Sequence, residues 1–263
     1  MDDRDLLVRE HANLIEAWVI AAAAPEGGLV RRTGGVACLL SGLPAAQFNQ
    51  ILVEDDTASP DAVVAAVAEA RERPAPWMLD LRVGTDDRFV PVAAALGLVP
   101  MTPEPWMPGM ALWPVSMDPP QPIPGHEIRR VTDDGGVAVH VATVSDAFGI
   151  PDELMRAIIT PGVARLPSVA VYVGYTDGVP ATAGMSVRSG STIGLYNIAT
   201  LASARRRGYG EAMTVRLAAD GVAAGCDLAV LQASPMGLRL YERLGYRTVV
   251  RYMAYVEPAL AAG

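Results

Sequence analysis

Four prolines lie within nine residues near the middle of the chain, in the segment Met-Asp-Pro-Pro-Gln-Pro-Ile-Pro-Gly at 117–125. Proline fixes its own backbone angle and has no amide hydrogen, so this segment should form a stiff, extended connector instead of a helix or a central strand. The chain has 263 residues, which is enough for two domains of ordinary size. The sequence therefore predicts two domains, at 1–116 and 126–263, with a linker at 117–125 between them.

Apolar residues of the first domain recur at helical spacing in some segments and form short strand-like runs in others. Over 3–23 they follow the i, i+3, i+4 pattern of an amphipathic helix. Ser59 and Pro60 are typical of a helix cap and a first helical residue, and Pro74 marks the end of that helix. We expect another helix at 86–96 and strands at 35–40, 48–53, 77–83 and 110–115.

The second domain begins with one expected strand and two helices. An Asp177-Gly178 turn then joins two expected strands as a hairpin. The expected strands are 128–131, 168–175, 181–187, 192–200, 227–232 and 246–256, and the expected helices are 133–148, 151–159, 208–224 and 235–244. This order predicts an α/β (α+β layered) domain.

Charge limits the chemistry available to this chain. All 21 basic residues are arginine, which excludes a Schiff-base lysine and a lysine-containing phosphate loop. The formal charge is −9 over residues 1–125 and +1 over residues 126–263, so the second domain is the better host for an anionic ligand. Neither half shows the basic face that binding of long nucleic acid requires, and we expect no nucleic-acid partner.

Metal sites, disulfides and membrane segments are not expected either. Cys38 and Cys226 are the only cysteines and fit buried apolar positions, while the three histidines are far apart in the sequence. The acidic start at 1–5 differs from a secretory signal, and no apolar stretch is long enough to span a bilayer. We therefore expect a cytoplasmic protein without membrane insertion.

The strongest local signal is Arg205-Arg206-Arg207-Gly208-Tyr209-Gly210, between an expected strand and an expected helix. Glycines allow backbone amides to approach an anion, the helix N-terminus adds partial positive charge, and arginines add charged donors. These features predict a phosphate-binding turn. A glycine turn with solvated arginines is the alternative for this short pattern.

A dinucleotide-binding motif also places G-x-G at the start of a helix. Met213 occupies the position where that motif needs a third small residue, and Asp227 lies at the start of the next strand instead of at its end. The sequence therefore disfavours a nicotinamide-dependent oxidoreductase.

A second motif follows downstream, Ser234-Pro-Met-Gly-Leu-Arg-Leu-Tyr241-Glu-Arg-Leu-Gly245-Tyr246. Together with the turn at Arg205–Gly210, it resembles the GNAT superfamily of N-acetyltransferases over residues 126–256. The first domain resembles a degenerate copy of the same fold, because its corresponding connection at 54–58 is acidic and has no glycine. A faint repeat, Val92–Leu98 and Leu240–Tyr246, supports two copies, although two similar helix ends can also arise by chance. The resemblance implies two GNAT-like domains, each a mixed, mostly antiparallel sheet flanked by helices.

The resemblance also implies which residues hold acetyl-CoA. One strand end would pair with the pantetheine arm through its backbone, the turn would bind the pyrophosphate, and Ser234 stands where the family usually has asparagine. The implied cofactor-binding residues are Ile198, Ala199, Thr200, Arg205, Arg206, Arg207, Gly208, Tyr209, Gly210 and Ser234.

Tyr241 matches the family's general acid, which protonates the departing coenzyme A thiolate. A phenol with a reference pKa of about 10 stays protonated at neutral pH, which suits that role, while simple packing of the ring is the alternative. The family often places a carboxylate base on the strand at 192–200, but here Asn197 is the only amide and no acid is present. Asn197 can orient a water or the acceptor amine, so we expect a water-relayed base or deprotonation of the amine before it binds.

The predicted function is transfer of an acetyl group from acetyl-CoA to a primary amine by direct attack in a ternary complex. The acceptor is a small-molecule or peptide amine, and the acidic first domain favours a cationic one. The alternative is a non-catalytic acyl-CoA-binding regulatory module. A homodimer is compatible with the sequence.

Overall fold

A computed structural model describes residues 1–105 and 107–261 of the chain. Contacts divide it into two compact units. Unit 1 comprises Met1–Met110, Ala233–Pro235 and Thr248–Gly263, and unit 2 comprises Ala111–Gln232 and Met236–Arg247. The last strand of the chain thus groups with the first unit, a difference from the predicted boundaries at 116 and 126. The division into 1–116 and 126–263, as two copies along the chain, stays a prediction.

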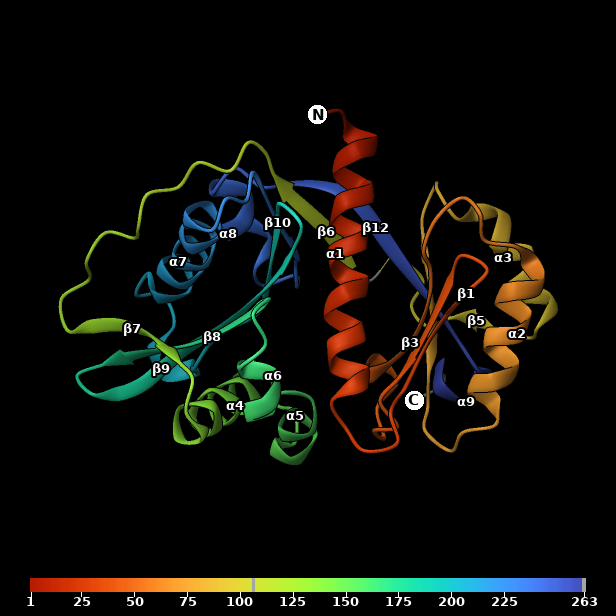
Figure 1. Cartoon of the computed structure of the whole chain (residues 1–263), viewed down its shortest axis with the longest axis horizontal. Coiled ribbons are helices and arrows are strands. Elements are labelled where there is room, and N and C mark those ends of the chain that lie inside the picture. Colours follow the sequence, from red (N-terminus) through yellow and green to blue (C-terminus); the bar gives the residue numbers. More distant parts are fainter. Residues whose placement is uncertain (106, 262–263) are drawn as a thin grey trace. The chain divides into compact units, whose positions relative to one another are not determined.

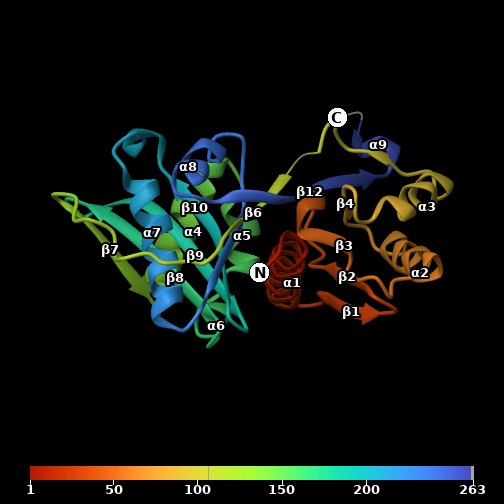
Figure 2. The ribbon, with the colours of Figure 1, turned by 90° about the horizontal axis from the view of Figure 1, so that it is seen from above.

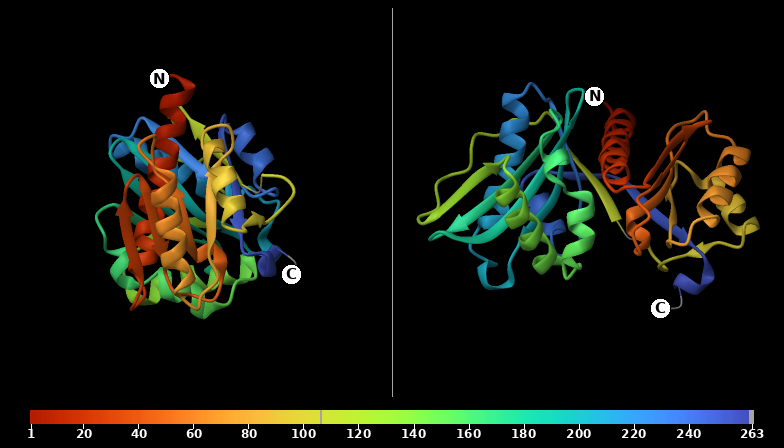
Figure 3. Two further views of the ribbon diagram at one scale, coloured as in Figure 1. Left: turned by 90° about the vertical axis from the view of Figure 1, so that its right-hand side faces the viewer. Right: turned by 60° about the horizontal axis from the view of Figure 1, so that its bottom comes forward.

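Unit 1 is a mixed sheet with helices on both faces (Figures 1 and 3). Its strands lie in the order β1-β2-β3-β4-β12, and only the β3–β4 pair is parallel. The short β5 also pairs with β12. The helices are α1 (Asp3–Ala23), α2 (Pro60–Arg71), α3 (Val90–Ala95) and α9 (Pro258–Ala261), and the strands are β1 (Leu29–Thr33), β2 (Val36–Leu40), β3 (Asn49–Val53), β4 (Met78–Arg82), β5 (Val99–Pro100) and β12 (Arg247–Val256). The chain passes from unit 1 to unit 2 within β6 (Met107–Leu112).

Unit 2 has α7 on one face of its sheet and α4 with α6 on the other (Figures 1 and 2). The strands lie in the order β7-β8-β9-β10-β11, antiparallel except for the last pair. The strands are β7 (His126–Val131), β8 (Val169–Thr176), β9 (Val179–Ser189), β10 (Thr192–Thr200) and β11 (Leu228–Gln232), and the helices are α4 (Asp134–Phe148), α5 (Asp152–Ile158), α6 (Pro161–Ala164), α7 (Tyr209–Ala223) and α8 (Leu238–Arg243).

The two units repeat one topology. In each, three antiparallel strands are followed by a helix and then by a strand parallel to the third: β1-β2-β3-α2-β4 in unit 1 and β8-β9-β10-α7-β11 in unit 2. The repeated segments also share their geometry, since α3 and α8 each end at a left-handed glycine, Gly97 (φ 78°) and Gly245 (φ 91°). Glycine adopts this conformation without steric cost and commonly ends a helix there.

The predicted elements are present, with a few additions. The structure adds β1, whose Leu-Val-Arg-Arg-Thr sequence lacks a buried residue because the strand lies at the edge of its sheet. The predicted helix at 235–244 is shorter, at Leu238–Arg243. Among the described residues, no helix has both the length and the apolar character needed to cross a bilayer.

Both units bury histidines. His140 on α4 donates from Nδ1 to the carbonyl oxygen of Tyr172 at 2.9 Å, and its Nε2 has no hydrogen-bond partner. Burial lowers the pKa of His140 to about 4, and burial together with Arg82 lowers the pKa of His11 to about 3. Both rings are therefore neutral in the folded protein at neutral pH.

Acid should destabilise the protein through His140. The unfolded histidine takes up a proton below its reference pKa of 6.5, whereas the folded one resists protonation until about pH 4, so stability falls across this window. The measurement is the free energy of unfolding in urea at pH 7.5 and at pH 4.5. Between these two pH values it should fall by about 2 to 3 kcal/mol more for the wild type than for His140→Asn, whose side chain keeps an N–H donor but does not titrate. Equal losses would show that His140 does not carry this effect.

Candidate active site

The predicted phosphate turn connects β10 to α7 within unit 2. Arg206 (φ 63°) and Gly208 (φ 82°) both have the left-handed conformation. Left-handed residues in a turn can aim backbone amides into a concave anion site. A Cβ atom on Gly208 would lie 3.6 Å from its nearest neighbour, the Cδ1 atom of Ile123. The backbone angle, and not crowding, is therefore what favours glycine here.

Helix α7 begins without a cap. Gly208 stands at the cap position and has no side chain that could accept a hydrogen bond from the first turn, and the first backbone bond runs from the Ala212 amide to the Gly208 carbonyl oxygen at 2.9 Å. The first amides of a helix have no partner within the helix, and the helix dipole places partial positive charge there. This end of α7 therefore offers donors to an anion.

The three arginines of the turn have different roles. Arg205 braces the turn, donating from Nε to the Thr200 carbonyl oxygen at 3.2 Å and from Nη2 to the Ala147 carbonyl oxygen at 3.3 Å. Arg206 and Arg207 are exposed, and neither has an ion-pair partner among residues 1–105 and 107–261. Two cations thus remain available beside the uncapped helix.

Strand β10 bends just before this turn. Tyr196 pairs with Met185 and Ala199 pairs with Ala183, so β10 has one extra residue against β9, a β-bulge. Asn197 lies in the bulge with φ 53°, a conformation that asparagine tolerates better than most residues. The parallel pairing with β11 ends at Gly194 and Val230, although β10 continues to Thr200 and β11 to Gln232. The two strands therefore part beside the predicted site.

Some of the predicted cofactor residues lie together in this region. Thr200 Oγ1 is 3.2 Å from where a Cβ on Gly210 would lie, which places the end of β10 against the first turn of α7. Ile198 is half-buried, and Ala199 is buried and paired with β9. Ser234 follows β11 in a segment that groups with unit 1, so its contact with a cofactor stays a prediction.

Tyr241 lies on α8, which has a contact to α7 through Arg243 and Glu211 at 3.9 Å. The ring packs over Gly237, where a Cβ would lie 2.8 Å from Cε2, and meets Tyr246 edge to face. Burial raises the pKa of Tyr241 to about 12. Within the described part of the chain, the Tyr241 hydroxyl has no hydrogen-bond partner. It is a protonated donor without a partner.

A stack of two aromatic rings, which no sequence pattern predicted, lies at the start of α7 next to the turn. Tyr209, the first residue of α7, lies on His126 of β7 with ring centroids 4.1 Å apart and an angle of 11°. His126 Nδ1 is 3.1 Å from Thr176 Oγ1, and burial lowers the pKa of His126. The His126 ring thereby connects the edge of the sheet to the start of α7. The two residues are far apart in the sequence, so no local pattern could indicate their contact.

The corresponding positions of unit 1 lack these features. Helix α2 is capped by Ser59, whose side chain accepts a hydrogen bond from the Ala62 amide, and its first residue, Pro60, has no amide hydrogen to offer. The preceding residues Glu54, Asp55 and Asp56 are acidic. Ala93 occupies the place in the repeat that Tyr241 has in unit 2. Unit 1 therefore offers neither the donors nor the phenol found in unit 2.

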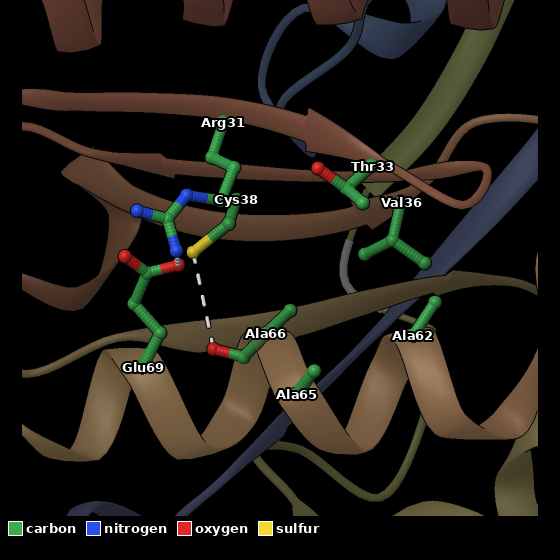
Figure 4. A pocket seen from close by; sticks show the side chains of 8 residues that line it. All are labelled: Arg31, Thr33, Val36, Cys38, Ala62, Ala65, Ala66 and Glu69. Atoms are coloured by element: carbon green, nitrogen blue, oxygen red, sulfur yellow. Dashed lines mark hydrogen bonds and ion pairs between the residues drawn. The ribbon is translucent and has the colours of Figure 1, made fainter.

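Unit 1 instead has a cavity of about 400 Å³ between its first two strands and α2 (Figure 4). Alanines of α2 form one wall, and an ion pair between Arg31 and Glu69 at 2.8 Å lies at its side. The Cys38 thiol lies 3.9 Å from the Ala66 carbonyl oxygen, and burial raises its pKa to about 12. Cys38 is thus a packed, protonated thiol and not a nucleophile, and Cys226 is also buried and forms no disulfide within the described residues, as the sequence predicted.

Comparisons with known proteins agree on the fold. No family model and no curated protein matches the sequence. The structure is similar to a GCN5-related N-acetyltransferase from Kribbella flavida, with TM-score 0.73, 18% identity and 95% of both chains covered. It is also similar to one from Sphaerobacter thermophilus (TM-score 0.59, 14% identity, 92% and 90% covered) and to a tandem GNAT protein from the clavulanic acid biosynthesis pathway (TM-score 0.59, 15% identity, 94% of each covered).

These similarities span both units, so the chain has the tandem GNAT fold that the motifs predicted. At such low identities they show the fold alone. Within the described residues, no group of three or more His, Cys, Asp or Glu side chains is arranged to hold a metal ion.

Proposed function

We propose that this protein transfers an acetyl group from acetyl-CoA to an amine and that unit 2 carries the reaction. The observation that carries this proposal is the start of α7, where an uncapped helix, two left-handed residues and two unpaired arginines occur together. A pyrophosphate is the part of acetyl-CoA that such a set of donors binds best. The parting of β10 from β11 beside it leaves a place for an extended arm.

Binding is divided among the residues predicted from the motifs. The amides of Gly208, Tyr209 and Gly210 and the side chains of Arg206 and Arg207 would hold the pyrophosphate. Arg205 acts indirectly, because its hydrogen bonds to the carbonyl oxygens of Thr200 and Ala147 hold the turn in place. The backbone of 198–200 would pair with the pantetheine arm, and Ser234 would add one polar contact. Acetyl-CoA supplies an activated acyl group as a thioester.

Tyr241 is the proposed proton donor. Its raised pKa keeps the phenol protonated at neutral pH, and its hydroxyl has no competing hydrogen-bond partner among the residues that the structure describes. Because a thiol with a pKa of about 8.5 is a stronger acid than this phenol, Tyr241 first stabilises the developing thiolate by a hydrogen bond. As the amide forms, the nitrogen of the acceptor amine loses one proton and the sulfur of coenzyme A gains one. The Tyr241 hydroxyl can pass on this proton and is itself protonated again at the end of the reaction.

Asn197 is proposed to orient the acceptor amine or a water through its amide. The bulge turns this residue away from regular strand geometry, and its side chain has no hydrogen bond to the rest of the described chain. An amide cannot take a proton, so deprotonation of the amine falls to water or precedes binding. Catalysis then depends mainly on positioning and on backbone donors near the thioester carbonyl.

Binding at the turn is tested by calorimetry with acetyl-CoA. Gly208→Glu places a carboxylate where the pyrophosphate would bind, so we expect binding by the wild type and a loss of at least 100-fold in affinity for the variant. Gly178→Glu is the matched control, because Gly178 has the same φ of 82°, lies in a hairpin turn and has open space around it. Equal affinity in all three proteins would contradict the site.

The role of Tyr241 is tested with Tyr241→Phe, which removes only the hydroxyl. Thiol release in a screen of primary amines should fall by about 100- to 10,000-fold, because loss of general acid catalysis costs about this much. Affinity for acetyl-CoA should stay within twofold of the wild type. If the wild type binds acetyl-CoA but releases no thiol with any amine, the protein is an acyl-CoA-binding module and not an enzyme.

A further inference from the structure

A second cavity in unit 2 is formed away from the turn. It has a volume of about 340 Å³ and lies between β7, β8, β9 and β10 and the last turn of α7. The α7 residues that line it, Asp220, Gly221 and Ala223, are at the opposite end of this 15-residue helix from Gly208. At 1.5 Å per residue the two places are about 20 Å apart. The cavity is therefore not part of the proposed acetyl-CoA site.

Two arginines line this cavity. Arg130 comes from β7 and Arg188 from the end of β9. Arg130 donates one bond, from Nη2 to the Val169 carbonyl oxygen at 3.3 Å. In the part of the chain that the structure describes, neither guanidinium has an ion-pair partner. Most of their donors are thus available to a ligand.

The carboxylate in the cavity wall, Asp220, already has hydrogen-bond partners within the protein. Asp220 accepts hydrogen bonds at Oδ2 from the Tyr172 hydroxyl at 2.6 Å and from Arg216 Nε at 2.9 Å. Arg216 therefore balances its charge, and the cavity keeps a positive excess from Arg130 and Arg188. This excess is unusual in a chain of net charge −8.

A serine hydroxyl faces the same space. Ser186 is only 4% exposed and lines the cavity, yet its hydroxyl has no hydrogen-bond partner among the described residues. The hydroxyl is open to the cavity, so a ligand held there can reach it. Ser186 thus supplies a donor that the protein itself does not use.

We propose that this cavity binds a small organic carboxylate. The planar fork of a guanidinium matches a carboxylate through two parallel hydrogen bonds, and the Ser186 hydroxyl adds a third donor. Asp220 in the wall disfavours a doubly charged phosphate, while Ala170, Ile193 and Ala223 offer apolar surface for a short carbon chain. The volume equals that of about eleven waters, which is room for several carbons.

Saturation-transfer NMR with butyrate tests this site at constant ionic strength, with butyramide as the uncharged control. Butyrate should bind saturably in the millimolar range, and butyramide at least tenfold more weakly. Arg188→Gln should weaken butyrate binding by at least tenfold and Ser186→Ala by two- to fivefold. Arg165→Gln, which removes an exposed arginine elsewhere in unit 2, should leave it unchanged.

Each other result overturns the proposal. Equal binding of butyramide would show that charge is not recognised, and equal weakening by Arg165→Gln would show a general effect of surface charge. Absence of saturable butyrate binding would exclude the site outright. Gly208→Glu should bind butyrate like the wild type, so the result stands whether or not acetyl-CoA binds at the turn.

Discussion

The first turn of an α-helix has amide groups that the helix itself cannot satisfy, and the cap residue of α7, Gly208, has no side chain that could satisfy them. The local structure around this end follows from that constraint. Gly208 and Arg206 take left-handed conformations to bring the chain into the helix, and Arg205 holds the turn to the end of β10. The amides at this end of α7 are left without a partner in the helix, and the parallel pairing of β10 with β11 stops at Gly194 and Val230. Such an end requires either water or an anion as its partner.

Two features keep this arrangement in place without any ligand. The stack of Tyr209 on His126 fixes the first residue of α7 to the edge strand β7, and Thr200 lies against Gly210 from the side of β10. Because both supports come from the sheet, the donors are positioned before a ligand arrives, which reduces the entropy that binding costs. Unit 1 shows the alternative solution for the same fold, since Ser59 caps α2 and no such donors remain.

Most helices and strands and the turn of the candidate site could be predicted from the sequence, because the residue patterns that indicate them lie within short segments. The helices, the hairpin at Asp177-Gly178 and the turn at Arg205–Gly210 each depend on a few neighbouring residues. Three features depend on distant ones and were missed: the edge strand β1, the grouping of β12 with unit 1, and the His126–Tyr209 stack. The sequence could not predict either that the side chains of Arg188 and Ser186 have no partner within the described residues. That depends on which residues the folded sheet brings near them.

The central claim is that the start of α7 binds the pyrophosphate of acetyl-CoA, and hydrogen–deuterium exchange tests it most directly. Saturating acetyl-CoA should slow exchange of the amides at 206–211 and of those at 198–200. The amides at 54–61, at the capped start of α2, should exchange at the same rate with and without the ligand. Protection that is absent from 206–211, or that appears at 54–61 instead, would contradict the account.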